Sequence, residues 1–222
     1  HWLFWRYAGY WMATTVWVLG CLSTGHVIVT KILGRTLRAL EHIPVAFCAG
    51  FFAFEVLMSI AGLFKLFGGA LFVIMPLICI AIGAKSSWLY TKRLARHVRR
   101  QRQKRSPSSI WELIAIGFGI LMFVAIYLSI MTPENAQFDS RWKHMGLAEE
   151  WVARGGIERF PEGLTFATRP HFTSFLFAWG FMAPGTLLFD HVLLCAHIEF
   201  WVFLLTTLLG IPALVRRLVP GA

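Results

Sequence analysis

Five apolar runs, each about 20 residues long, constrain this chain more than any other feature. They cover roughly residues 7–29, 43–64, 70–90, 110–131 and 187–214. A helix of this length crosses the roughly 30 Å hydrocarbon core of a bilayer, because each residue adds about 1.5 Å. Only 14% of the 222 residues are charged, against about 25% in soluble domains. The sequence therefore predicts an all-α integral membrane protein with about five transmembrane helices.

The basic residues are unevenly placed along the chain. Eight of the 21 fall in one stretch between the third and fourth apolar runs: Lys92, Arg93, Arg96, Arg99, Arg100, Arg102, Lys104 and Arg105. Loops rich in Lys and Arg stay in the cytoplasm, and such a cluster can also contact anionic lipids. We therefore expect residues 92–105 in a cytoplasmic loop. The net charge of +10 would suit nucleic acid in a soluble protein, but a stretch between two spans argues against that partner.

The segment between the last two apolar runs is expected on the extracytoplasmic side. From Ser140 to Arg154, apolar residues recur at helical spacing with charged residues largely between them, and Gly155-Gly156 supplies a stop. This pattern predicts an amphipathic helix lying at the membrane surface. An aromatic-rich stretch from Thr173 to Met182 is too short to span and is expected to be interfacial or re-entrant.

The same segment carries a recognisable order of residues. After a span and a proline come Phe138-Asp139-Ser140-Arg141-Trp142-Lys143-His144-Met145, then Leu147-Ala148-Glu149-Glu150-Trp151 and Arg154-Gly155-Gly156-Ile157. This order resembles the first extracytoplasmic loop of bacterial GT-C type membrane glycosyltransferases. That group uses polyprenyl-phosphate sugars and includes protein mannosyltransferases and lipid A aminoarabinose transferases. The likeness covers roughly residues 111–219. Relatives often have an aromatic-His pair where this chain has Lys143-His144.

The resemblance implies a sugar transfer from a polyprenyl phosphate to an extracytoplasmic acceptor, at the bacterial inner membrane. Such enzymes usually have about ten or more spans, so the chain would correspond to the N-terminal portion of one. It would comprise a three-helix membrane region (1–91), a basic cytoplasmic loop (92–109) and a GT-C-like region (110–222). In that region an extracytoplasmic loop (132–186) separates the span at 110–131 from the span at 187–214.

Asp139 is the catalytic base that the resemblance implies. An inverting displacement at the anomeric carbon needs a carboxylate to accept the proton of the acceptor hydroxyl. The alternative is that Asp139 only caps the helix that follows it. Two further catalytic candidates and four candidates for binding the donor phosphate complete the site: His144 and Glu149, then Arg141, Lys143, Arg169 and His171.

These candidates have plainer readings as well. Glu149 and Glu150 suit a solvated helix face, His144 suits an interfacial histidine, and Arg169 and His171 suit contacts with lipid head groups. His197 and Glu199 lie deep in the last apolar run, where interhelical contacts are favoured over catalysis. The four cysteines sit inside apolar runs without metal-ligand spacing and are read as packing residues. The sequence leaves open whether a divalent metal ion is a cofactor, since no cluster of metal ligands is evident.

A second function from another class competes with the transferase. The chain can instead be a non-enzymatic transmembrane subunit that packs against other subunits of a larger membrane complex. Abundant Trp and Phe would provide its helix-packing surfaces.

Overall fold

Every element of the chain that the structure describes is a helix. The computed structural model describes residues 3–32, 34, 37–103, 109–131, 140–158, 172–185 and 190–218. The elements in chain order are α1 (Leu3–Val27), η1 (Ile28–Ile32), α2 (Ala39–Leu63), α3 (Gly69–Gln103), α4 (Ile110–Ser129), η3 (Ser140–Met145), α5 (Gly146–Ala153), α6 (Phe172–Phe181), α7 (His191–Phe203), η5 (Leu204–Gly210) and α8 (Ile211–Leu218), the η segments being π-helical. The all-α prediction is confirmed.

Four helices are long and apolar enough to cross a membrane. They extend over Tyr7–Ile32, Glu41–Leu63, Gly69–Arg96 and His191–Val215, the last formed by α7, η5 and most of α8 in succession. The predicted fifth crossing is α4, whose apolar stretch Leu113–Ser129 is shorter than these four. By length and composition, the described residues therefore form a polytopic membrane protein, as the sequence predicted.

The basic segment after the third span differs from the prediction. We expected a loop from residue 92 onward, but α3 continues as a helix to Gln103. Lys, Arg and Gln are good helix formers, and neither Gly nor Pro occurs between Tyr90 and Pro107 to stop the helix. The eight basic residues therefore begin on the last turns of α3, while Lys104 and Arg105 lie outside the described residues.

Close backbone contacts join α1 to α2 and α3. A Cβ on Gly25 would lie 1.7 Å from the Ala46 carbonyl oxygen, and a Cβ on Gly50 would lie 1.7 Å from that of Cys21. On α3, a Cβ on Gly83 would lie 2.2 Å from the Ser23 carbonyl oxygen. Small residues at helix interfaces permit such an approach in membranes, where van der Waals packing drives association.

Hydroxyl groups of α1 reinforce the contact with α3. Ser23 Oγ donates to the Ile80 carbonyl at 2.9 Å, and Thr24 Oγ1 donates to the Cys79 carbonyl at 2.9 Å. Both carbonyls belong to α3, in the turn after Pro76. α1 is thereby held to α3 by polar as well as steric contacts.

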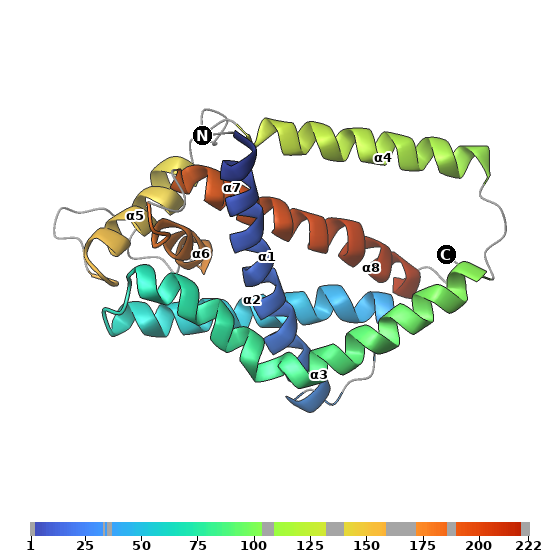
Figure 1. The fold of residues 1–222 in the computed structure, drawn as a ribbon, viewed down its shortest axis with the longest axis horizontal. Helices are drawn as coiled ribbons and strands as arrows, with labels where there is room; N and C mark the ends of the chain where they lie inside the picture. The colour runs from blue at the N-terminus through green and yellow to red at the C-terminus, as the bar shows by residue number, and fades with distance from the viewer. Residues whose placement is uncertain are drawn as a thin grey trace.

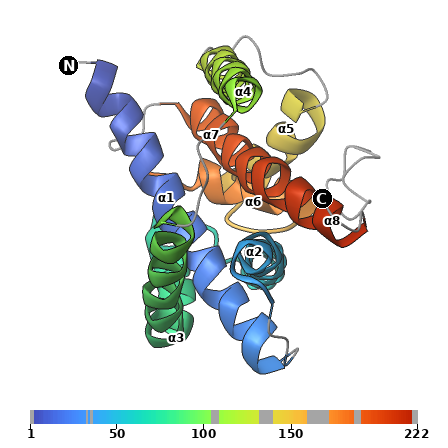
Figure 2. The ribbon, with the colours of Figure 1, turned by 90° about the vertical axis from the view of Figure 1, so that its right-hand side faces the viewer.

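α4 stands apart from the other helices along most of its length (Figures 1 and 2). Its described side chains are all exposed from Ile110 to Met122, and contacts begin only at Phe123. Phe123 and Tyr127 reach Phe200 of α7, and the Tyr7 hydroxyl donates to the Met131 carbonyl at 3.1 Å. α4 is therefore attached to α1 and α7 at its C-terminal end.

The remaining short helices and the basic helix ends lie at opposite ends of the bundle. α5 and α6 gather where α2 turns into α3, whereas α8 lies beside the first half of α2 at the far end (Figure 1). At that far end the His26 and His42 rings are hydrogen-bonded at 2.8 Å, and both pack against Tyr90. The basic ends of α1, α3 and α8 thus share one end of the molecule, and the compartment they face stays a prediction.

Candidate functional site

The segment that carries the resemblance folds into a small helical layer, which we call the platform: η3, α5 and α6. The predicted amphipathic helix from Ser140 to Arg154 is present as η3 followed by α5. Leu147, Ala148 and Trp151 are buried along one face, while Glu149 is exposed on the other. The predicted short aromatic helix is α6, which begins at Phe172 and ends at Phe181.

α6 is held in place by a carbonyl that a proline leaves open. Pro76 has no N–H, so the Phe72 carbonyl four residues earlier loses its normal partner in α3. Trp179 Nε1 of α6 donates to that carbonyl at 3.0 Å, and its ring stacks on Phe72 at 4.7 Å between centroids. The same indole packs against Trp17 of α1. The platform is therefore anchored in the core of the bundle.

Backbone hydrogen bonds join the end of α5 to the turn between α2 and α3. Phe67 N donates to the Gly155 carbonyl at 3.0 Å, and Ile157 N donates to the Gly62 carbonyl at 2.9 Å. Gly155 has a φ of +75°, a left-handed conformation that favours glycine and ends the helix there. Gly156 allows the close approach, since a Cβ on it would lie 2.5 Å from the Gly62 carbonyl oxygen.

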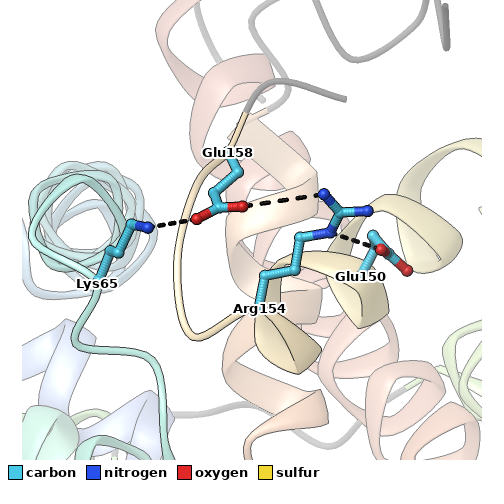
Figure 3. Close-up of polar contacts among 4 residues, drawn as sticks. All are labelled: Lys65, Glu150, Arg154 and Glu158. Atoms are coloured by element: carbon cyan, nitrogen blue, oxygen red, sulfur yellow. Dashed lines mark hydrogen bonds and ion pairs between the residues drawn. The ribbon is translucent and has the colours of Figure 1, made fainter. Parts of the chain in front are cut away.

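A chain of four alternating charges closes the same junction (Figure 3). Lys65 in the turn pairs with Glu158, which faces Arg154, and Arg154 Nε donates to Glu150 Oε1 at 2.7 Å. The hydrogen bond and positive charge of Lys65 lower the pKa of the Glu158 carboxyl, with a smaller contribution from Arg154. Glu150 and Glu158 are thus engaged structurally.

His144 occupies the junction between the two layers of the platform. Its Nδ1 lies 3.1 Å from Ser174 Oγ of α6, and that serine is fully buried. About two turns further along, the Trp151 and Phe175 rings stack at 5.1 Å with 18° between their planes. These contacts set the orientation of the His144 ring relative to α6.

The predicted site residues fall into three groups. His144 and Glu149 lie on the platform as expected, and Lys143 is half-buried beside His144 in η3. Arg141 belongs to η3, but its side chain lies outside the described part of the structure. Asp139, Arg169 and His171 also lie outside the described residues. The structure thus places His144 in η3 and Glu149 in the adjoining α5, and it leaves the base assignment a prediction.

Interhelical contacts account for His197, as the sequence analysis favoured. Its Nε2 lies 3.2 Å from the Tyr127 hydroxyl of α4, and its Nδ1 donates to the Leu193 carbonyl at 2.7 Å. Glu199 is exposed on the opposite side of the helix. Asp190 caps α7, because its Oδ1 accepts from Val192 N and Leu193 N at 2.9 Å and 3.2 Å.

Some polar residues were not anticipated. The pair of Lys65 and Glu158 spans 93 positions, and no sequence pattern connects them. Glu55 lies in the second span with 1% exposure, and both its carboxyl oxygens lack a hydrogen-bond partner among the described residues. Its position as a lone acid inside an apolar run could have identified Glu55 as a candidate functional residue, because intramembrane carboxyls are costly and usually functional.

Metal ligands and known relatives add no constraint to this site. Within the described ranges, no three His, Cys, Asp or Glu side chains converge in a way that could hold a metal ion. Comparison of the chain with protein-family models, with curated proteins and with solved structures finds no match.

Proposed function

We propose that this chain is part of a membrane glycosyltransferase that moves a sugar from a polyprenyl phosphate to an extracytoplasmic acceptor. The observation that carries the proposal is the platform. A short amphipathic helix follows directly after the Asp139 segment and is clamped to the end of the membrane bundle by α6 and by the α2–α3 turn. A lipid-linked donor needs its reacting carbon presented at this kind of membrane-surface element.

The charges of the platform support one division of roles. Lys65 forms an ion pair with Glu158, and Arg154 forms one with Glu150. None of the ion pairs among the described residues involves Glu149. Glu149 is therefore the exposed acid available to an acceptor or a cation. His144, oriented by Ser174, is positioned to contact acceptor or phosphate oxygens. These assignments rest on the resemblance together with this geometry.

The proposed reaction is an inverting displacement. The Asp139 carboxylate accepts the proton of the acceptor hydroxyl while that oxygen forms a bond to the anomeric carbon. The bond from the anomeric carbon to the phosphate oxygen breaks, and the bonding electrons leave with the polyprenyl phosphate. Arg141, Lys143, Arg169 and His171 are proposed to stabilise the negative charge of that leaving group.

The test is sugar transfer by the Asp139→Asn variant in membranes, with polyprenyl-phosphate mannose and polyprenyl-phosphate aminoarabinose supplied separately. We measure the release of polyprenyl phosphate and the labelling of acceptor. Asn keeps the size and helix-capping ability of Asp but cannot accept a proton, so transfer should fall at least about 100-fold. Glu112→Gln, on α4 and away from the platform, is the matched control. Unchanged transfer in Asp139→Asn would remove the base assignment.

One observation favours the alternative of a structural subunit. The described side chains in the first half of α4 are all exposed, which leaves a large apolar surface for another membrane segment. Two results together would favour the subunit role. The first is that Asp139→Asn retains full transfer, or that no donor is consumed at all. The second is that a substitution such as Ile116→Arg abolishes co-purification of a membrane partner.

A further inference from the structure

A pocket of about 750 Å³ opens at the basic end of the molecule, opposite the platform. It lies between the first half of α2 and the η5–α8 segment, and its walls include Val29, Pro44, Val45 and Leu214. Val45 and Leu214 belong to helices long and apolar enough to cross a membrane and are 43% and 57% exposed, so the pocket is an open groove on the surface of these helices. Its volume falls in the range of about 300–1,000 Å³ that small-molecule sites occupy.

The mouth of the groove is charged. Arg217 of α8 donates through Nη2 and Nε to a single oxygen of Glu41, at 2.8 Å and 3.3 Å. Both residues line the groove, and the Arg217 side chain is 58% exposed, whereas that of Glu41 is only 10% exposed. The guanidinium is thus accessible from outside while the carboxylate lies beneath it.

A second cation, Arg38, lies near Glu41, although it is not itself one of the lining residues. Arg38 caps the start of α2, its carbonyl accepts from Glu41 N at 3.0 Å, and its exposed side chain acts electrostatically on the Glu41 carboxylate. The three side chains of Arg217, Arg38 and Glu41 together carry a net charge of +1. A single phosphodiester charge complements that balance, and Arg presents paired N–H donors to phosphate oxygens.

We propose that this groove binds an anionic phospholipid, with an acyl chain along the apolar walls and the phosphate at Arg217 and Arg38. The exposed apolar wall residues Val45 and Leu214 lie on helices long and apolar enough to span a bilayer, which favours a phosphate carried on a lipid over a free anion. This site is separate from the platform and does not depend on the proposed sugar transfer. It would fix the basic end of the bundle to anionic lipid.

Binding is tested by native mass spectrometry of the full chain released from detergent micelles, with phosphatidylglycerol and phosphatidylcholine titrated separately. Phosphatidylglycerol should bind about fivefold more tightly, the gain expected for one arginine near an anionic lipid phosphate. Arg217→Gln and Arg38→Gln should each reduce that preference to near one. Lys65→Gln removes an exposed charge at the opposite end of the bundle instead and should leave the preference unchanged.

Glu41→Gln separates lipid binding from a structural role of the ion pair. Removing the carboxylate frees the Arg217 guanidinium for phosphate, so phosphatidylglycerol should bind about fivefold more tightly than to the wild type. If the pair only held α8 to α2, the same variant would weaken binding of both lipids. That result would overturn the proposal.

A groove-filling variant locates the site. A Cβ on Gly210 would lie 3.8 Å from Pro44 Cβ, an ordinary contact at the groove wall, so Gly210→Leu can place its side chain in the groove. This variant should lose most bound phosphatidylglycerol and the cross-links of a photoreactive analogue to Val45. Equal affinity of the two lipids in the wild type, unchanged binding in Gly210→Leu, or displacement by millimolar inorganic phosphate would each contradict the proposal.

Discussion

The Tyr127 hydroxyl of α4 lies 3.2 Å from Nε2 of His197 on α7, and the two groups complete a chain of hydrogen bonds. Trp11 Nε1 donates to the Tyr127 oxygen at 2.6 Å. Because the Leu193 carbonyl can only accept, His197 Nδ1 carries a proton, which leaves Nε2 of a neutral ring free to accept from Tyr127. Three helices are thereby joined by groups whose hydrogen-bonding capacity is met.

Removing the Tyr127 hydroxyl should loosen α4. Tyr127→Phe leaves Trp11 Nε1 and His197 Nε2 without this partner, which should lower the free energy of unfolding by about 1–3 kcal/mol. Unfolding in mixed micelles of increasing SDS content measures the change. Trp111→Phe alters an exposed aromatic residue on the same helix and is the control. Equal effects of the two substitutions would mean that the hydrogen bonds do not hold α4.

The anchor of α6 depends on Pro76 as well as on Trp179. Pro76→Ala restores an N–H that competes for the Phe72 carbonyl, so Trp179 Nε1 should lose its partner although neither residue is changed. Trp179→Phe should lower stability by about 1–3 kcal/mol, through loss of the hydrogen bond and of part of the indole. In the Pro76→Ala background, Trp179→Phe should lower the free energy of unfolding by a smaller amount.

This coupling is measured by a double-mutant cycle on the two substitutions, with unfolding followed by tryptophan fluorescence. Phe175→Leu, one turn earlier on α6 at a ring that stacks on Trp151 instead, serves as an uncoupled comparison. Additive effects of Pro76→Ala and Trp179→Phe would show that the open carbonyl is not what attracts the indole.

Glycines at the contact of α1 with α2 should tolerate no side chain. Gly50→Ala places a Cβ 1.7 Å from the Cys21 carbonyl oxygen, and only backbone displacement can relieve that clash. We expect a loss of at least about 3 kcal/mol or failure to assemble. Gly119→Ala on α4 is the matched control, because a Cβ there meets nothing within 4 Å. It should be neutral or stabilise α4 by up to about 1 kcal/mol.

The sequence allowed the helices to be predicted because their signals are local. Apolar length indicated the spans, and the apolar spacing with Gly155-Gly156 indicated the helix that became η3 and α5. The gap between the apolar runs at 43–64 and 70–90 indicated a break in the helix, and Lys65 adopts a φ of 56° there. Each of these features depends on neighbouring residues and therefore appears in the sequence pattern.

The contacts that shape the site could not be predicted, since they join distant positions. Nothing near Pro76 indicates that its open carbonyl accepts from Trp179, and nothing near Lys65 indicates Glu158. The basic stretch was expected as a loop because its charge was weighed above its helix propensity, and α3 continues through it to Gln103. Asp139 depends on resemblance alone, so its role stays a prediction.

The pair of Lys65 and Glu158 predicts a pH dependence of platform docking. Lys65 lowers the pKa of Glu158, so the folded state binds a proton there less readily than the unfolded chain. The stabilising contribution is therefore present above the ordinary pKa near 4.5 and is lost as the pH falls through the lower pKa of the folded state. Glu158→Gln removes this contribution at every pH.

Thermal unfolding at pH 6.5 and at pH 3.5 checks this sign. Glu158→Gln should lower the midpoint at pH 6.5, and its deficit relative to the wild type should be smaller at pH 3.5. Glu149→Gln alters an acid outside the ion pairs of the described residues and should change neither midpoint. A deficit of Glu158→Gln that is equally large at both values would assign its effect to packing.

Glu55 tests whether a buried carboxyl inside the bundle stabilises the fold. Its oxygens have no hydrogen-bond partner among the described residues, although the side chain is 1% exposed in the second span. Burial of an unpartnered polar group costs about 1–3 kcal/mol, so Glu55→Leu should raise the free energy of SDS-induced unfolding by a similar amount. Glu55→Gln keeps polar atoms at the same place and should bring no such gain.

The contrast between the two Glu55 variants decides how the residue is used. A gain for Glu55→Leu, combined with no gain for Glu55→Gln, would show that the fold tolerates the acid at a cost, as residues kept for function do. A loss of stability in Glu55→Leu would mean instead that the carboxyl is held by a group such as a buried water, which Gln can retain and Leu cannot. Because the two substitutions differ little in size, packing changes affect both alike and do not blur this comparison.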